Sequence, residues 1–362
     1  MSAAATAPDL MSASVYRGAG RVVYEQVGIP EIGPGEILVK VAACGICHTD
    51  LKKIEYDLLT PPRIYGHETA GTVAAIGAGV TKFQIGDRVC VCHHIPCGDC
   101  FYCRHKDYAQ CARYIQVGVT AGFEPAGGGF AQYVRVMDWI VDAGVEKIPD
   151  GVSFERGTFV EPLNTCLKGV EKCALSPDET VLVMGQGPIG LLFTMLLKQR
   201  GMEHIYASDR LPERLAKAEK LGAARAWDPT QVDIAAELRA ATSGRGADVV
   251  IVAASAPGIV EQAVALTRPG ARIMLFAQTS SQEKFELDGA GIGKNERMVF
   301  GSYSASVDLQ RESAEIVWRE DFPVEDLISH RLPLAELERG IEIARRPQDG
   351  SLKVLVYPQE QD

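Results

Sequence analysis

The second half of the chain alternates short apolar runs with helical stretches, and no other feature restricts the fold as strongly. Runs rich in β-branched residues have the length of buried strands, at residues 181–184, 204–208, 248–253 and 272–276. Helical stretches separate them, at residues 189–200, 212–221 and 259–266. Pro212 and Gly222 mark the two ends of the second helix. Such alternation predicts a parallel, doubly wound sheet, and therefore an α/β fold.

A glycine-rich turn joins the first of these strands to the first helix. The run Gly185-Gln186-Gly187-Pro188-Ile189-Gly190 has the spacing G-x-G-x-x-G, which is weak alone but specific between a strand and a helix. Gly185 would permit the tight turn, Gly187 would let the backbone approach a pyrophosphate, and Gly190 would let the helix pack closely. We therefore predict a dinucleotide site at this turn, with Pro188 and Ile189 in the first turn of the helix.

An acidic residue follows at the end of the second strand. Asp209 lies about 20 residues beyond the turn, where a carboxylate can accept hydrogen bonds from the adenosine ribose. Because this carboxylate would repel a 2′-phosphate, we expect NAD rather than NADP. The neighbouring Arg210 is a second candidate cofactor residue and keeps NADP open. The plainer interpretation is a structural glycine turn with a surface aspartate.

Four cysteines fall within one short segment: Cys97, Cys100, Cys103 and Cys111. Four thiolates suit a closed tetrahedral Zn²⁺ site, whose binding energy would fold the loop around it. With no open position, this ion would be structural and not catalytic. The spacing by itself also allows an iron–sulfur cluster or a zinc-ribbon interaction module, whereas four free thiols at this density are not expected.

A second constellation would leave a metal ion open to substrate. Cys47 lies in the motif Gly-Ile-Cys-His-Thr-Asp, and His67 lies in Gly-His-Glu. With Glu161 as a third ligand, a thiolate, an imidazole and a carboxylate leave the fourth position for water or substrate, as in catalytic zinc sites. Taken singly, each of these residues is more often part of a core or a surface, so the interpretation depends on the other motifs.

Together these motifs resemble the zinc-containing medium-chain dehydrogenase/reductase superfamily, that of zinc alcohol and polyol dehydrogenases. The resemblance extends from about residue 14 to 358 and includes Gly-Asp-Arg-Val at 86–89 and Gly-Gly-Phe-Ala at 128–131. It implies a β-rich GroES-like catalytic domain with an inserted Rossmann cofactor domain. We expect a loose tail at residues 1–13, a catalytic zinc domain at 14–164 and 303–362, and an NAD-binding domain at 165–302.

The resemblance also implies roles around the catalytic zinc. Cys47 and His67 match the first two ligands. Glu161, in a Glu-Pro-Leu motif like that of polyol-type relatives, matches the third, which binds zinc directly or through water. Glu68 would be an exchangeable ligand or a neighbour of one. Asp50 matches the carboxylate that orients the histidine ligand.

Other positions match the substrate and cofactor sites of the family. Thr49 would bind the substrate oxygen and pass its proton onward, with help from His48 or from solvent. Lys52 stands where a relay histidine is common. Thr165 would pack near the nicotinamide, and Lys353 would reach the pyrophosphate as a point charge.

A few positions depart from the family pattern or compete with it. Cys166 is a rival to Glu161 as a ligand, although it is expected in the core. His93 stands where relatives often have an aromatic pocket residue; a polar wall there would suit a polyfunctional substrate, or His93 would simply cap the cysteine segment. Ser302-Tyr303 replaces an Arg-Tyr pair of polyol relatives, which weakens a sorbitol-like assignment.

The expected activity is zinc-dependent hydride transfer between NAD and a secondary alcohol of the polyol, cyclitol or amino-alcohol type. The resemblance implies two Zn²⁺ ions per subunit, one catalytic and one structural. The catalytic ion would lower the pKa of the substrate hydroxyl toward roughly 7. The alternatives are an NADPH-preferring aldehyde or ketone reductase and a catalytically silent regulator that binds zinc and nucleotide.

Composition narrows the partners and the location. The formal charge is 37 − 47 = −10, an acidic balance that disfavours nucleic acid, and no apolar run approaches the roughly 20 residues of a membrane span. The first residues lack the pattern of a secretory signal, and clustered cysteines in such a chain indicate a reducing compartment, so we expect a cytoplasmic protein. The resemblance implies a homodimer or homotetramer that acts on a small molecule.

Overall fold

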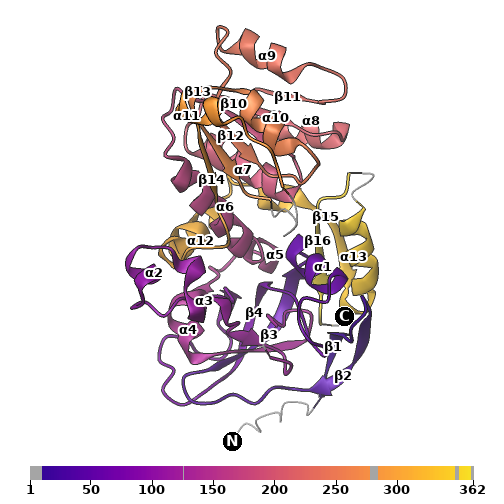
Figure 1. The fold of residues 1–362 in the computed structure, drawn as a ribbon. Helices are drawn as coiled ribbons and strands as arrows, with labels where there is room; N and C mark the ends of the chain where they lie inside the picture. Colours follow the sequence, from indigo (N-terminus) through magenta and orange to yellow (C-terminus); the bar gives the residue numbers. More distant parts are fainter. Residues whose placement is uncertain (1–9, 125, 278–283, 347–349, 360–362) are drawn as a thin grey trace, which may run out of the picture. The chain divides into compact units, whose positions relative to one another are not determined.

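The computed structural model describes residues 10–124, 126–277, 284–346 and 350–359, which divide into two compact units (Figure 1). The first unit contains the described residues up to Pro162 together with residues 305–346 and 351–359. The second unit contains residues 163–277 and 284–304. The chain passes from one to the other within helix α6 (Val160–Cys173) and after Ser304. The roles expected for them, catalytic and NAD-binding, stay predictions.

The first unit is mainly β-structure. Its strands are β1 (Leu10–Tyr16), β2 (Val22–Gly28), β3 (Ile37–Gly45), β4 (Glu68–Ile76), β5 (Arg88–Val91), β6 (Val119–Thr120), β7 (Tyr133–Val136), β8 (Val145–Lys147), β15 (Ile328–Pro333) and β16 (Lys353–Tyr357). An eight-stranded sheet has the order β15-β16-β3-β4-β5-β8, and β7 pairs with β3 and β6. Only the β15–β16 pair of this sheet is parallel among the described strands. A separate hairpin joins β1 and β2.

Short helices connect these strands. They are α1 (His48–Glu55), α2 (Phe101–Arg104), α3 (Ala112–Ile115), α4 (Asp138–Gly144), α5 (Phe154–Gly157), α12 (Gln310–Trp318) and α13 (Leu337–Arg345). Single 3₁₀ turns are η1 (Tyr108–Gln110), η2 (Val307–Leu309), η3 (Val324–Leu327) and η4 (Leu334–Glu336). Most of the unit therefore depends on pairing between strands that are distant in sequence.

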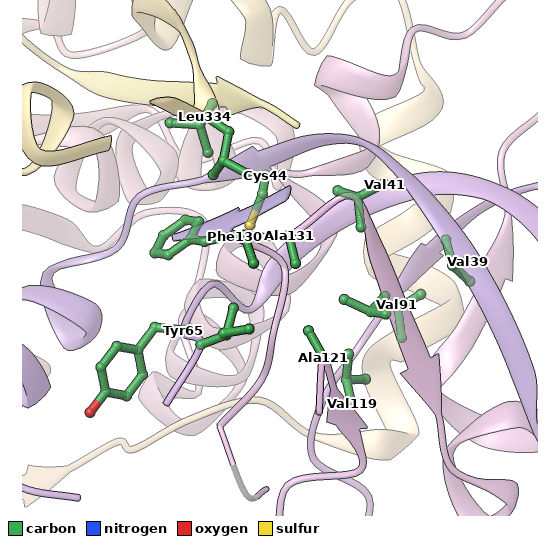
Figure 2. Packing of buried hydrophobic residues seen from close by; sticks show 14 of the residues in the cluster. Val39, Val41, Cys44, Tyr65, Val91, Val119, Ala121, Phe130, Ala131 and Leu334 are labelled. Carbon is green, nitrogen blue, oxygen red and sulfur yellow. The ribbon is translucent and has the colours of Figure 1, made fainter. Parts of the chain in front are cut away.

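The core of the first unit lies against the large sheet. Val39 and Val41 of β3 are fully buried, while Lys40 between them is exposed, which is the alternation expected of a strand with one face in a core. Figure 2 shows Val91 and Val119 beside these residues, and Cys44, Phe130 and Ala131 together in the same cluster. Tyr65 lies at the edge of the view, with its hydroxyl directed away from the other labelled side chains. Burial of such side chains stabilises the fold by about 25 cal/mol per Å² of apolar surface.

The second unit is a parallel six-stranded sheet. Its strands are β9 (Thr180–Met184), β10 (His204–Ser208), β11 (Arg225–Trp227), β12 (Ala247–Val252), β13 (Thr267–Leu275) and β14 (Met298–Gly301). Their order is β11-β10-β9-β12-β13-β14, and every described pair is parallel. In chain order this is 3-2-1-4-5-6, the order of Rossmann folds. The predicted fold class, a GroES-like β-rich domain with a doubly wound domain inserted, is confirmed.

Helices cover the strands of this sheet. They are α7 (Pro188–Gln199), α8 (Pro212–Leu221), α9 (Ile234–Ala241), α10 (Ile259–Ala265) and α11 (Gly289–Gly293). Helix α7 packs on β9 and β10, and α10 packs on β12 and β13. All residues of β9 are buried, as expected for a strand covered on both faces. Among the described helices, none combines the length and the apolar character needed to cross a bilayer.

Candidate functional site

Three adjacent strands bring the Cys47 motif close to the His67 motif and to Lys353. Gly45, the last residue of β3, pairs with Glu68, the first residue of β4. On the other side of β3, the N–H of Ile46 donates to the carbonyl oxygen of Val354 in β16, 2.9 Å away. The chain segments that carry Cys47, His67, Glu68 and Lys353 therefore meet at one end of the sheet.

Asp50 connects the cysteine to the histidine. Cys47 caps the N-terminus of α1, and its N–H donates to Asp50 Oδ2 at 3.1 Å. Asp50 Oδ1 lies 3.1 Å from His67 Nδ1 and 3.4 Å from the N–H of Gly66. Asp50 is fully buried, so these partners replace the water that a carboxylate would otherwise bind. The contact fixes the orientation of the imidazole and leaves Nε2 for another partner.

The electrostatic surroundings of His67 favour positive charge. Burial alone would lower its pKa, but the charges of Asp50 and Cys47 raise the pKa well above its ordinary value. Burial likewise opposes ionisation of Asp50, yet His67 holds the pKa of this carboxyl below its usual range. The site is thus built to stabilise a cation next to the thiolate.

Glu68 is the third donor that the structure brings to this point. Ligand atoms of Cys47, His67 and Glu68 all lie within 4.8 Å of one another. A side chain on Gly45 would place its Cβ 1.9 Å from Glu68 Oε2, so the carboxylate needs the glycine opposite it in the strand pair. Glu68 itself is almost fully buried.

Lys353 binds this carboxylate directly. Its Nζ lies 2.7 Å from both carboxylate oxygens of Glu68 and 3.4 Å from the carbonyl oxygen of Ile46. Burial would lower the pKa of Lys353, but Glu68 and Cys47 raise it, so the lysine stays charged. The resemblance implies that Lys353 reaches a cofactor pyrophosphate, a role that stays a prediction; in the structure its ammonium group binds Glu68. Only the strand order β16-β3-β4 reveals this pair, which is 285 residues apart in sequence.

Glu161 does not belong to the three-donor set. It is the second residue of α6, and no described group of mutually close ligand atoms includes its carboxylate. Burial raises its pKa to about 7, and the charge of Glu68 adds to this effect. The structure therefore favours Glu68, which the resemblance gives as an exchangeable ligand, over Glu161, which it gives as a ligand bound directly or through water. Cys166, the rival, lies in the second unit, with its Sγ 3.9 Å from the carbonyl oxygen of Ile189.

The donor set fits zinc. A thiolate, an imidazole nitrogen and a carboxylate oxygen are ligands found in catalytic zinc sites, which leave one position open. The Nδ1 atom of His67 contacts Asp50 Oδ1, which is the arrangement that orients histidine ligands in metal sites. Thr49, half-buried in the first turn of α1, donates its N–H toward Cys47 Sγ at 3.5 Å, while the side chain of His48 is exposed. Lys52 lies one turn further along the same helix, half-buried.

A row of neighbouring aromatic rings, tilted relative to one another, begins at His67. The ring centroids of His67 and His93 are 4.8 Å apart, those of His93 and His94 3.8 Å, and those of His94 and Tyr114 5.0 Å. Burial lowers the pKa of His93 well below its ordinary value and that of His94 to about 3, so both rings are neutral. Within the described chain, Nδ1 of each is buried without a hydrogen-bond partner. The sequence pointed to His93 but not to His94, although the His-His dipeptide was visible.

The four-cysteine segment forms its own cluster. Ligand atoms of Cys97, Cys100, Cys103 and Cys111 lie within 4.8 Å of one another, and none of them forms a disulfide. The Sγ of Cys103 lies 3.8 Å from that of Cys97 and 3.5 Å from that of Cys100. A tetrahedron with Zn–S bonds of about 2.3 Å has sulfur atoms about 3.8 Å apart. Backbone N–H groups, that of Cys97 first, outweigh burial and lower the pKa of Cys111 to about 6. The segment thus fits a closed Zn²⁺ site.

The glycine turn of the second unit has the geometry expected of a dinucleotide site. Gly185 has φ of +92°, which favours glycine, and a Cβ on Gly190 would lie 1.8 Å from the carbonyl oxygen of Gly185. Gly187 caps α7, and a Cβ there would meet nothing closer than Arg214 Nη1 at 3.6 Å, so the turn is open on this side. Pro188 is the first residue of the helix, and Ile189 follows it, partly exposed.

Asp209 follows β10, beside this turn. Its Oδ2 accepts a hydrogen bond from the N–H of Gln186 at 2.7 Å, and its Oδ1 accepts one from the N–H of Leu211 at 3.0 Å. Arg210 is exposed. The glycine turn and a carboxylate thus lie together at the carboxyl edge of the sheet, where ligands of Rossmann folds bind. Thr165 lies in α6 and is largely buried.

Comparison with known proteins identifies the family of the chain. Residues 33–180 match the family model of the alcohol dehydrogenase GroES-like domain, and residues 188–319 match that of the zinc-binding dehydrogenase. Sorbitol dehydrogenase of Bacillus subtilis (strain 168) is 30% identical over 358 residues, which cover 98% of this chain and 99% of that protein. L-threonine 3-dehydrogenase of Caldanaerobacter subterraneus subsp. tengcongensis is 31% identical, covering 91% of this chain and 93% of that one. A protein from Sinorhizobium meliloti 1021, solved with NADP bound, superposes with a TM-score of 0.86 at 32% identity, covering 97% of this chain and 100% of the other.

The fold, the four-cysteine cluster and the group of Cys47, His67 and Glu68 define a class, the zinc-type oxidoreductases built from a GroES-like domain and a Rossmann domain. The chain belongs to the zinc-containing medium-chain dehydrogenase/reductase superfamily.

Proposed function

We propose that the protein is a zinc- and NAD-dependent dehydrogenase of secondary alcohols, with Cys47, His67 and Glu68 as protein ligands of the catalytic zinc. The observation that carries this proposal is the convergence of these three donors with Asp50 on the outer nitrogen of His67. Cys97, Cys100, Cys103 and Cys111 would hold a second, structural zinc.

Each residue around the proposed zinc site would have its own role in the reaction. When bound, zinc lowers the pKa of the substrate hydroxyl, and the nicotinamide accepts the hydride. Thr49 would take the hydroxyl proton at Oγ1 as it gives up its own toward solvent. The exposed His48, and Lys52 one turn further along the helix, are the candidates for the next position. Asp50 holds His67 in one tautomer. Lys353 balances the charge of Glu68, which would otherwise be unpaired in a buried site.

We propose NAD as the preferred cofactor, with Gly185, Gly187, Gly190 and Asp209 at its site. The support is electrostatic: the two carboxylate oxygens of Asp209 lie beside the turn and would repel a 2′-phosphate. Because a similar protein was solved with NADP bound, the test compares NAD with NADP. The ratio of kcat/KM with NAD to that with NADP is expected to exceed about tenfold, and a preference for NADP would contradict this use of Asp209.

We propose a polyfunctional alcohol as substrate, of the polyol, cyclitol or amino-alcohol type. The support is the neutral imidazole pair of His93 and His94 beside His67, whose nitrogens can bind a further hydroxyl or amine of the substrate. Relatives named for sorbitol and for L-threonine agree with a substrate of this kind. The substitution His93→Phe should lower kcat/KM for diols more than for simple secondary alcohols.

The test of the function is a screen of NAD reduction over simple alcohols, polyols, cyclitols and amino alcohols, with zinc content measured on the same preparation. The proposal predicts turnover with at least one class, lost on chelation and restored by Zn²⁺. A strong preference for carbonyl reduction with NADPH would favour a reductase. Zinc and NAD binding without turnover of any compound would favour a silent regulator. Cytoplasmic location and assembly as a homodimer or homotetramer stay predictions, the second checked by light scattering of the purified protein.

A further inference from the structure

A buried polar pair lies beneath the glycine turn. Gln186 and Thr194 are both fully buried, although each carries polar side-chain atoms. The Nε2 of Gln186 donates to the carbonyl oxygen of Val183 in β9 at 3.1 Å, and its Oε1 accepts a hydrogen bond from Thr194 Oγ1 at 3.0 Å. Thr194 lies in the second turn of α7, so the amide links the strand before the turn to the helix after it.

Apolar side chains would fill this place more simply. A buried amide or hydroxyl costs free energy unless its hydrogen bonds are satisfied, and it gains little over a hydrocarbon of the same shape when they are. The hydroxyl of Thr194 has one hydrogen, and its other neighbour is the carbonyl oxygen of Gly190, four residues earlier, at 3.1 Å. The hydrogen bond to Gln186 therefore adds a link that the helix does not require.

The same residue also contacts the ribose side of the site. The backbone N–H of Gln186 donates to Asp209 Oδ2 at 2.7 Å. A Cβ on Gly190 would lie 3.4 Å from Gln186 Nε2, so the side chain fills the space directly under the turn. Gln186 thus contacts β9 and α7 through its side chain and Asp209 through its backbone N–H. A shift of this residue would therefore move the glycine turn and Asp209 together.

We propose that Gln186 and Thr194 are positioning residues, which hold the glycine turn and Asp209 in the geometry that binds the dinucleotide. The inference rests on the proposed function, in that the second unit is taken to bind NAD. Without the link, the turn would populate other arrangements, and binding would have to reorder it. The apparent affinity is then the intrinsic affinity multiplied by the fraction of molecules in the competent arrangement.

The test is fluorescence titration of the full-length protein with NADH, using Gln186→Met, Thr194→Val and the double variant. These substitutions keep the side-chain shape and remove the hydrogen bond. We expect each single variant to bind NADH about three- to tenfold more weakly, and the double variant to be no weaker than the weaker single one, because both remove the same link. Thr194→Ser, which keeps the hydroxyl, should bind as the unchanged protein does. The KM for NAD should rise while kcat at saturating NAD and zinc content stay the same.

Three results would overturn the inference. A lower melting temperature with unchanged NADH affinity would make the pair structural only. Losses that add in the double variant would show that the two residues act separately. Absence of NADH and NADPH binding in the unchanged protein would contradict the proposed function, and this inference with it. The first two results would contradict only the inference and leave the proposed function standing. Thr194→Val and Thr194→Ser keep the inference open to refutation even if Gln186→Met does not fold.

Discussion

Cys47, which is partly exposed, has a thiol whose surroundings differ from those of the buried cysteines. It caps a helix, receives the N–H of Thr49 and lies beside His67, whereas Cys166 packs against the backbone of α7. Cys47→Ser is expected to remove about one zinc ion per chain and to lower kcat by at least about a hundredfold, because a hydroxyl is a poor zinc ligand. Metal analysis and NAD reduction measure these changes. Cys166→Ala is the matched control and should keep its zinc; turnover undiminished in Cys47→Ser would refute the role of Cys47.

The Asp50–His67 pair makes zinc binding depend on pH. Asp50 and Cys47 raise the pKa of His67, so the imidazole must lose a proton when metal binds, and the apparent zinc affinity should fall as the pH falls. Asp50→Asn removes the charge, so His67 loses its proton more easily and the pH dependence should become shallower. The same change loosens the ligand, and we expect affinity at neutral pH to fall about 10- to 100-fold.

Competition with a chelating dye between about pH 6 and pH 8 measures both effects. An equally steep pH dependence in Asp50→Asn and in the unchanged protein would show that another group takes up the proton.

Individual residues differ in how far the sequence predicts them. Cys47, His67 and Asp50 were predictable from the sequence because they lie in two short motifs, and the structure brings them close together. The resemblance already gave Glu68 as an exchangeable ligand. Its place beside Cys47 and His67 ahead of Glu161, and its ion pair with Lys353, were not predictable, because they depend on how β4 and β16 align with β3. Short motifs record what is near in sequence, whereas strand order decides which distant residues meet.

At the scale of elements, the turn between β9 and α7 offers a comparison between two glycines. Gly190→Ala would place a Cβ 1.8 Å from the carbonyl oxygen of Gly185, so backbone must shift and we expect a loss of about 1–3 kcal/mol of stability. At Gly187 the space for a Cβ is free of protein atoms to 3.6 Å, and its φ of −66° suits alanine.

Gly187→Ala should therefore fold with nearly unchanged stability but bind NADH at least about tenfold more weakly, since its methyl group would occupy the approach of the pyrophosphate. Thermal unfolding and NADH titration of the two variants separate packing from binding. If NADH bound Gly187→Ala as tightly as the unchanged protein, the pyrophosphate would not lie at this turn.

The cysteine segment is a second element whose order should depend on metal. Its helices α2 and α3 have four residues each, too short to be stable alone, and its buried residues form only a small cluster. Cys103→Ser is expected to remove about one zinc ion per chain and to make the segment sensitive to proteolysis, because the ion contributes folding energy. Cys173→Ala, which alters a cysteine far from this segment in sequence, should leave the zinc content unchanged. Equal zinc content in Cys103→Ser would contradict a tetrahedral four-cysteine site.

Elements with strong periodicity were predictable, and short ones were not. Strands β9 and β10 and helices α7 and α8 were expected within a residue or two of their bounds, since buried strands and proline- and glycine-marked helix ends leave clear signals. Strand β11 has three residues, with its first residue exposed, and α9 has eight; neither carries a distinctive pattern. Their existence follows from the sheet, which needs a further strand beside β10.

At the scale of the whole molecule, two metal sites of different kinds are expected in one chain. Four thiolates would close the coordination of the first ion, whereas the three donors at Cys47 would leave one position for substrate. The strand–helix alternation of the second half predicts a sheet with a core of its own. The structure divides the chain into two compact units, and the chain passes from the first to the second within α6. The substrate was not predictable, because the shape of a binding pocket depends on side chains that lie far apart in the sequence.

Anomalous diffraction at the zinc absorption edge, from crystals grown with Zn²⁺ and NAD, tests the central claim most directly. The account predicts two peaks per chain, one within the four cysteines and one bounded by Cys47, His67 and Glu68. A single peak at the four cysteines, with Cys47 and His67 turned away from each other in fully zinc-loaded protein, would contradict it.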